Sequence, residues 1–372
     1  MKIPGLDALL YRTVRFLHQA GKIQTVRDLG SARLDEVRSI LITVTTALGD
    51  SITFTPALTA MRDRFPRTRI VGLYHHAFSS LYEGDPRMDR IIPYYGKYKR
   101  LRATLRALRE ESCELALLPY MNDPDIIPMV LWGGSRILFR MPGRNTIYSF
   151  LVAQKELLRP TPPPDHSNLR ATDMVKHLGC AIGSQRTSLH IPGESAARVD
   201  EILKPCKVAH ESAPLIGFHP GASVQWKCWP PESYVELAGR LLSRLNGAQI
   251  ALTGSLAEHS LCERIRKAGE SGRIINLAGK IPIRDMPNFL GRLAVFVSGD
   301  TGVAVMAYAV GCRTVTLFWK TNPSISGPME VGDRHRVIRA ESREAVRPDR
   351  VLIESIDQIE TSRKESNVRN IR

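Results

Sequence analysis

The feature that most constrains the fold of this chain is an alternation of short apolar runs and helical segments that occurs twice. The first series starts with a buried-strand pattern at 39–45 and continues with a helix at 56–65 and strands at 69–74 and 114–118. Short apolar strands separated by helices are typical of a mostly parallel sheet with helices on both faces. The sequence therefore predicts an α/β fold.

The second series begins at Pro214 and repeats this order. We expect strands at 215–219, 249–253, 294–297 and 314–318, with helices at 232–245, 257–268 and 303–310. The length of 372 residues also exceeds what one hydrophobic core usually serves. We therefore predict two doubly wound, Rossmann-like domains that face each other across a cleft. Ligands of open α/β sheets bind beyond the carboxyl ends of the strands, so the polar loops there are candidate sites.

Four segments follow from these patterns. They are an N-terminal extension with an amphipathic helix (1–38), a first domain with a connector (39–205), a second domain (206–345) and a C-terminal tail (346–372). The connector contains a stiff proline-rich run at 159–164.

The N-terminal extension carries a helical apolar pattern at 6–22. Its apolar positions are Leu6, Leu9, Leu10, Val14 and Leu17. Two interpretations stay open, a helix docked on the body of the protein and an anchor on a membrane surface. We expect neither a signal peptide, because Arg12 and Arg15 interrupt the apolar stretch, nor a membrane-spanning run.

The chain is strongly basic, with 52 Lys and Arg against 37 Asp and Glu, a net charge of +15. Such an excess predicts an anionic partner: nucleic acid, an acidic membrane surface or a phosphorylated substrate. Nucleic acid is disfavoured because the sequence has no RNP-like or helix-turn-helix signature. The six cysteines form no Cys-x-x-Cys pair, so no metal site is indicated, and they suit the reducing cytoplasm.

The loop at 298–307 places Gly-Asp-Thr-Gly between a predicted strand and a predicted helix. Thr301 and Gly302 would start that helix, whose N-terminal N–H groups form an anion site, and Asp300 is the candidate cap. This pattern suits a cradle for a diphosphate. A capped turn without a ligand is the alternative.

Two more loops of the second series carry candidate binding residues. In the loop at 219–230, Ser223 offers a hydroxyl and Lys227 a point charge for a phosphate, although the same segment also starts the next helix. In the loop at 253–258, Glu258 lies in the first helical turn. It either complements the helix dipole or accepts hydrogen bonds from ribose hydroxyls.

The first series contributes a carboxylate and a basic run. Asp50 follows the strand at 39–45 and could take a proton from an incoming hydroxyl, although a nearby helix N-terminus should lower its pKa. An N-capping acid is the alternative. The basic run comprises Lys97, Lys99, Arg100 and Arg102. It suits either a solvated helix face or a docking face for a phosphorylated acceptor or anionic lipid head groups.

These loops, in this order, resemble glycosyltransferase family 9, the ADP-heptose:lipopolysaccharide heptosyltransferases, over about residues 39–340. The resemblance rests on the Leu-Gly-Asp turn that ends at Asp50, the Pro-Gly-Ala…Lys-x-Trp-Pro segment at 220–230, the Thr-Gly-x-x-x-Glu loop at 253–258 and the Asp-Thr-Gly loop at 300–302. It implies a GT-B fold whose first domain binds the acceptor and whose second domain binds a nucleotide-sugar donor.

The resemblance also implies an inverting, metal-independent transfer of heptose from ADP-heptose to a lipopolysaccharide core acceptor, with no cofactor. Asp50 is then the general base, Lys227 neutralises donor phosphate, Glu258 holds the ribose, and residues 300–302 line the diphosphate and sugar. The basic run would meet the anionic glycolipid acceptor. The implied location is cytoplasmic, peripheral on the inner face of the inner membrane.

The sequence departs from the family pattern at two places in the second series. Val305 stands where the family has a histidine, and Trp319-Lys320 replaces the usual Gly-Pro. Two alternatives therefore remain beside the heptosyltransferase reading. One is a related transferase that uses another nucleotide sugar for a different surface glycan. The other is a basic scaffold without activity.

Overall fold

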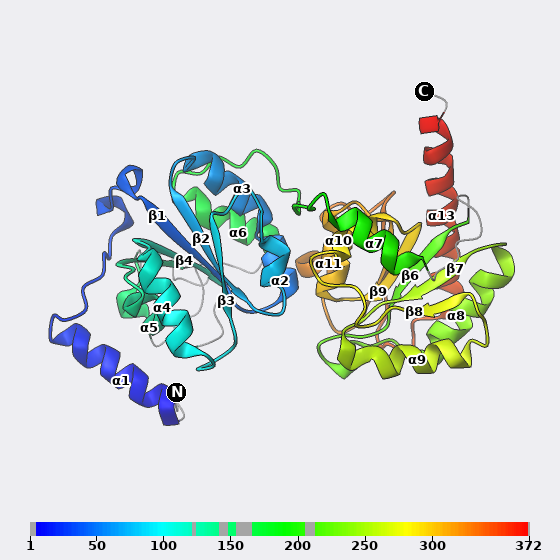
Figure 1. The fold of residues 1–372 in the computed structure, drawn as a ribbon, viewed down its shortest axis with the longest axis horizontal. Coiled ribbons are helices and arrows are strands. Elements are labelled where there is room, and N and C mark those ends of the chain that lie inside the picture. Colours follow the sequence, from blue (N-terminus) through cyan, green and yellow to red (C-terminus); the bar gives the residue numbers. More distant parts are fainter. Residues whose placement is uncertain (1–4, 121–123, 141–147, 154–165, 205–212, 371–372) are drawn as a thin grey trace. The chain divides into compact units, whose positions relative to one another are not determined.

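The chain forms two compact units, Met1–His190 and Ile191–Arg372, each built on its own sheet. The computed structural model describes residues 5–120, 124–140, 148–153, 166–204 and 213–370 (Figure 1). The proline-rich run at 159–164 and the predicted domain boundary at 205–206 lie outside the described residues.

The sheet of the first unit is parallel throughout, with the order β3-β2-β1-β4-β5. Its strands are β1 (Ser39–Val44), β2 (Arg69–His75), β3 (Arg90–Tyr94), β4 (Leu115–Tyr120) and β5 (Ile137–Arg140). The three strands predicted for this unit are confirmed as β2, β1 and β4, which lie in the centre of the sheet. Central strands are buried on both faces, and this produces the continuous apolar runs that the sequence shows.

Helices cover both faces of this sheet (Figure 1). They are α1 (Gly5–Gln19), α2 (Leu48–Thr53), α3 (Thr55–Arg64), α4 (Leu101–Glu111), α5 (Ile126–Trp132) and α6 (Ser167–Lys176). Helices α1, α4 and α5 share one core with the sheet, and α3 packs against α6. The predicted N-terminal helix is thus confirmed, and it docks on the body through the buried side chain of Val14.

The sheet of the second unit is also parallel, with the order β11-β10-β9-β6-β7-β8. Its strands are β6 (Leu215–His219), β7 (Gln249–Leu252), β8 (Ile274–Asn276), β9 (Val295–Gly299), β10 (Thr314–Phe318) and β11 (His335–Arg339). This is the strand order of the dinucleotide-binding Rossmann fold. The predicted strands are confirmed as β6, β7, β9 and β10.

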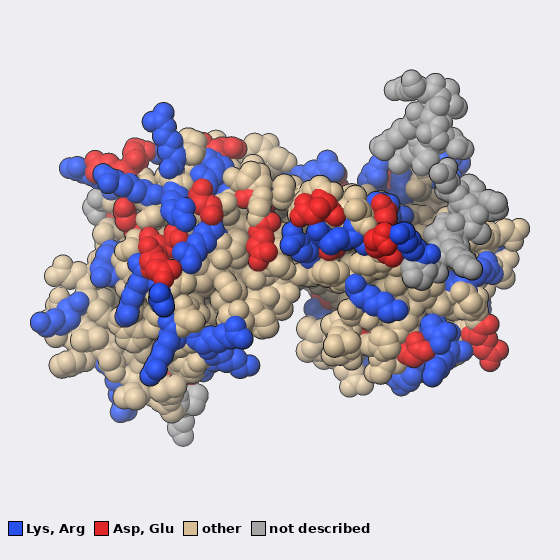
Figure 2. Space-filling model, viewed as in Figure 1, with Lys and Arg blue, Asp and Glu red and all other residues tan. Residues whose placement is uncertain are grey.

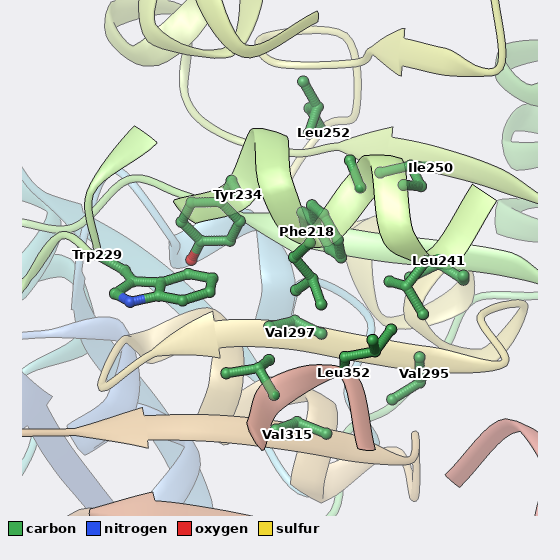
Figure 3. Close-up of a cluster of buried hydrophobic side chains, with 14 of the residues drawn as sticks. Phe218, Trp229, Tyr234, Leu241, Ile250, Leu252, Val295, Val297, Val315 and Leu352 are labelled. Atoms are coloured by element: carbon green, nitrogen blue, oxygen red, sulfur yellow. The ribbon is translucent and has the colours of Figure 1, made fainter. Parts of the chain in front are cut away.

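The helices of the second unit include the three that the sequence predicts. They are α7 (Ser195–Leu203), α8 (Pro231–Arg244), α9 (His259–Ala268), α10 (Met286–Gly291), α11 (Gly302–Ala309), α12 (Pro323–Ser326) and α13 (Pro348–Asn370). Figure 3 shows the core on one face of the sheet, where Trp229 and Tyr234 meet at the start of α8.

The segment expected to be a C-terminal tail is helix α13, and its first half belongs to this core. Val351, Leu352 and Ile359 are buried there against α8 and the sheet. In the part of the chain that the structure describes, none of the helices combines the length and the apolar character that crossing a membrane requires.

In both sheets the strand order reverses at one point, between β1 and β4 in the first unit and between β6 and β9 in the second. The crevice beyond the carboxyl ends of two such strands is where ligands of this architecture bind. The loops that follow β1, β6 and β9 are the ones that carry Asp50, Lys227 and Asp300.

Candidate functional site

The loops after β6 and β9 meet at the switch point of the second unit. The two strands pair directly, with His219 opposite Ser298. Beyond them, Lys227 Nζ lies 2.8 Å from Asp300 Oδ2, and the hydroxyl of Ser326 donates to Asp300 Oδ1 at 3.2 Å. The structure thus brings together two of the residues that the sequence assigned to the donor phosphate. Ser223, assigned with them, is exposed in the loop after β6.

The N-terminus of α11 follows this ion pair directly. The residue that caps the helix is Thr301, whose hydroxyl accepts a hydrogen bond from the N–H of Ala304 at 3.2 Å. The expectation that Asp300 is the cap was wrong, because Lys227 and Ser326 engage its carboxylate instead. Gly302 is the first helical residue, as predicted. A helix N-terminus and a lysine side by side form a site suited to a diphosphate.

Close backbone packing holds the two loops together. A Cβ on Gly299 would lie 2.9 Å from the carbonyl oxygen of Lys227, so only glycine allows the approach. Trp319 follows the end of β10, and its indole N–H donates a hydrogen bond of 2.7 Å to the carbonyl of Trp226. Trp319, one of the departures from the family pattern, therefore supports the lysine loop. Trp226 itself is 42% exposed beside the Lys227 ammonium.

Glu258 joins the loop after β7 to the loop after β6. Its Oε2 accepts hydrogen bonds from the N–H and the hydroxyl of Ser255, at 2.6 and 2.8 Å, which forms a capping box. The other oxygen, Oε1, faces Gly221, where a Cβ would lie only 1.8 Å away. Glu258 lies in the first helical turn, as predicted, and its role toward a ribose stays a prediction.

A buried histidine that sequence reasoning did not single out supports these strand ends. The hydroxyl of Thr253 donates to the carbonyl of Phe218 and lies 3.0 Å from His219 Nδ1, so we assign the proton to Nδ1. Burial lowers the pKa of His219, while the nearby carboxylate of Glu258 opposes this shift. Through this contact with Thr253, the neutral imidazole links the end of β6 to the loop after β7, which carries Glu258.

In the first unit, Asp50 lies in the first turn of α2, directly after β1. Its Oδ2 accepts a hydrogen bond from the hydroxyl of Thr46. Burial raises the pKa of the Asp50 carboxyl, and the Thr46 hydrogen bond offsets only part of that shift. The expected lowering by a helix N-terminus was therefore wrong in direction, because the loss of hydration outweighs it. A raised pKa makes the carboxylate a stronger base.

Side chains that the sequence did not reveal fix this turn at the switch point. The buried hydroxyl of Tyr82 donates to Ser51 Oγ at 2.8 Å, and Ser51 Oγ donates to the carbonyl of Leu48. Thr53 Oγ1 lies 3.2 Å from the hydroxyl of Tyr120, at the end of β4. The signal available in the sequence was Tyr120, a polar side chain two residues beyond the strand predicted at 114–118.

The basic run divides into two parts. Lys97 Nζ lies 2.6 Å from Asp7 Oδ2 and holds helix α1 in place. This contact within the protein departs from the expectation that all four residues meet an anionic ligand. Lys99 is exposed, and the guanidinium of Arg100 stacks on the ring of Tyr95 at 4.1 Å. Arg102 lines a shallow groove of about 470 Å³ along α4.

Among the described residues, no group of three or more His, Cys, Asp or Glu side chains is arranged to hold a metal ion. The arrangement in the second unit places the Lys227 ammonium, paired with Asp300, beside a helix N-terminus that suits an anion. The arrangement in the first unit offers a carboxylate that can accept a proton.

Comparison with known proteins relates the second unit to one family. Residues 174–352 match the sequence model of glycosyltransferase family 9 (heptosyltransferase). Lipooligosaccharide heptosyltransferase 2 of Haemophilus influenzae is 31% identical over 152 residues, which span 40% of this chain and 42% of that protein. Lipopolysaccharide heptosyltransferase 2 of Escherichia coli is 31% identical over 130 residues, 34% of this chain and 36% of that protein. The matched segments thus span well under two thirds of these relatives.

Solved structures extend the likeness to most of the chain. The family 9 glycosyltransferase from Veillonella parvula superposes with a TM-score of 0.76 at 17% identity, covering 88% of this chain and 98% of that one. The ADP-heptose lipopolysaccharide heptosyltransferase II of Escherichia coli gives 0.69 at 20% identity, covering 87% and 99%. These likenesses show the fold, which is GT-B.

Proposed function

We propose that this chain, whose residues 174–352 match the model of glycosyltransferase family 9, transfers a heptose from ADP-heptose to a lipopolysaccharide core acceptor, with inversion at the anomeric carbon. The observation that carries the proposal is the placement of Lys227 beside Asp300 at the N-terminus of α11. This is a diphosphate site at the switch point of a Rossmann sheet. The names of the relatives support heptose as the sugar and lipopolysaccharide as the acceptor.

The proposed reaction divides the work between the two units. Asp50 accepts the proton of an acceptor hydroxyl, whose oxygen attacks the anomeric carbon of the donor sugar. The bond from that carbon to the diphosphate oxygen breaks, and ADP leaves with the electron pair. Lys227 and the N–H groups at the start of α11 take up the charge that develops on the diphosphate. We propose that neither a metal ion nor a cofactor takes part.

Glu258 is the proposed ligand of the nucleoside ribose. Its Oε2 is committed to Ser255, and Oε1 is the oxygen that can accept from a ribose hydroxyl. Residues 300–302 line the donor sugar and the diphosphate, with Asp300 held in place by Lys227. We place the enzyme in the cytoplasm, peripheral to the inner membrane that carries its anionic glycolipid acceptor.

The experiment for the proposal compares Asp50→Asn with the wild-type protein. We expect transfer of heptose from ADP-heptose to fall to background, while ADP binding stays unchanged because the ligands of ADP lie in the second unit. Calorimetric titration with ADP provides that control. Transfer at the wild-type rate by Asp50→Asn would refute the assignment of the base.

A second candidate function, transfer of another sugar, is motivated by Val305. This residue is 7% exposed on α11, and its apolar side chain offers no hydrogen bond to a sugar. A thermal-shift panel of ADP, UDP, GDP, CMP and their sugar conjugates separates the candidates. A ligand at about a hundred times its Kd stabilises the fold by about 2.7 kcal/mol. Selective stabilisation by another nucleotide would favour the second candidate, and none at all would favour an inactive scaffold.

A further inference from the structure

Helix α1 carries apolar side chains on two sides, of which only one is used for packing. Its inner side holds the buried Val14 and places the ring of Tyr11 5.9 Å from that of Tyr148. On the outer side, Leu6, Leu9 and Phe16 are 56, 62 and 67% exposed. Their spacing of three and seven residues places them on one face of the helix. This outer ridge of α1 is an apolar surface without a partner in the described part of the chain.

The helix is held firmly, so that the ridge has a defined orientation. Asp7, on the inner side, pairs with Lys97 at 2.6 Å and accepts a hydrogen bond from the hydroxyl of Tyr98. At the other end, His18 Nδ1 lies 3.1 Å from the carbonyl of Ile23, and the His18 ring packs on Phe150. A ridge fixed at both ends presents three apolar side chains to the same external surface.

The surroundings of the outer ridge are basic. Arg12 and Arg15 are exposed on α1 itself. The loop that anchors Asp7 continues with the exposed Lys99 and Arg100. Helix α4 carries the exposed Arg102, Arg106 and Arg109 one turn apart, of which Arg106 pairs with Glu110. In Figure 2 the charged side chains visible on the lower part of the first unit, where Figure 1 shows α1 and the start of α4, are mostly Lys and Arg. The matching partner is therefore anionic around an apolar centre.

We propose that α1 docks the protein on an anionic lipid bilayer, with Leu6, Leu9 and Phe16 inserted at the boundary between head groups and acyl chains. Arg12 and Arg15 would then meet lipid phosphates. An amphipathic helix with an apolar ridge and flanking arginines binds membranes in this way, parallel to the surface. A second copy of the chain is a poorer partner, because a symmetric contact through the ridge would bring the arginines of both copies together.

This inference goes beyond sugar transfer, because it requires a bilayer but no glycan acceptor. The test is flotation of the full chain with vesicles of phosphatidylethanolamine and phosphatidylglycerol, compared with phosphatidylcholine alone. We expect the wild-type protein to float with the anionic vesicles. The Leu9→Ser/Phe16→Ser variant should bind about tenfold more weakly or worse, because two apolar side chains no longer leave water. Arg12→Gln/Arg15→Gln should also lose roughly tenfold, selectively on anionic vesicles.

The matched control is Ile353→Ser, which removes an apolar side chain that is 65% exposed on α13 of the second unit. It should float like the wild-type protein. Thermal denaturation verifies that each variant is folded. If the double serine variant does not fold, the arginine variant alone tests the proposal. Failure of the wild-type protein to float, or equal flotation of all variants, would overturn the proposal. So would a wild-type dimer that the serine variant converts to monomer without any vesicle binding.

Discussion

Replacing Lys227 by methionine removes the charge at the proposed diphosphate site and keeps nearly the same shape. Hydrogen bonds to charged groups contribute about 1.5–3 kcal/mol each. If Lys227 binds the diphosphate through one such bond, its loss raises the Kd of ADP roughly 10- to 150-fold. The same variant leaves the carboxylate of Asp300, which is only 11% exposed, with Ser326 as its remaining donor. We therefore also expect a loss of about 1–3 kcal/mol of unfolding free energy.

Two control variants separate binding from folding. Lys267→Met removes an exposed positive charge from the last turn of α9 and should leave ADP binding unchanged. Asp300→Asn removes the carboxylate that competes with phosphate for Lys227, so ADP should bind several-fold more tightly if charge governs the site.

The assay is calorimetric titration with ADP at one fixed, low salt concentration, because salt screens charge interactions. Thermal denaturation of each variant shows whether it is folded. A folded Lys227→Met protein whose Kd for ADP changed by less than about twofold would refute the assignment of Lys227 to the phosphate. Weaker ADP binding by Asp300→Asn would show instead that Asp300 positions the lysine.

Three further substitutions test how the loops are built. Gly221→Ala should push the carboxylate of Glu258 aside, so its loss of ADP affinity should equal that of Glu258→Ala. In the double variant the two losses should not add, and calorimetric titration with ADP measures this. Thr46→Val removes the hydrogen bond that lowers the pKa of Asp50, so in a pH profile of kcat/KM the acidic limb, where the base becomes protonated, should move to higher pH. Trp319→Phe removes the hydrogen bond to the lysine loop, and we expect ADP to bind several-fold more weakly while a melting curve shows a loss of about 1 kcal/mol.

The sequence predicts the centre of each sheet and misses its edges. The seven strands that the apolar runs indicated are all interior, whereas β3, β5, β8 and β11 lie at the four sheet edges. Interior parallel strands are buried on both faces and therefore read as continuous apolar runs. Edge strands are short or contain residues that weaken pairing, such as Pro93 in β3, so their pattern is faint.

The sequence predicts which loops carry the candidate site residues, but it does not predict their pKa shifts and hydrogen bonds. The positions of Asp50, Lys227 and Asp300 follow from the order of strands and turns, because each loop follows a central strand. The raised pKa of Asp50 does not, because it comes from burial, and burial depends on how distant parts of the chain pack around α2, such as Tyr120 beside Thr53. The capping of α11 by Thr301 also escapes local reasoning, since it depends on a lysine 73 residues away that engages Asp300 instead.

The pairing of Lys227 with Asp300 has a consequence for how a donor would bind. With the ion pair formed, the second unit presents a locally neutral loop rather than a free ammonium group. A diphosphate must then compete with a carboxylate for the lysine, so part of the attraction between the lysine and ADP is offset before binding. A neutral sugar hydroxyl near Asp300 would not face this repulsion and could donate a hydrogen bond to a carboxylate oxygen. The pair would therefore favour a complete nucleotide sugar over its nucleotide product, and in the proposed reaction it would help ADP to leave after transfer.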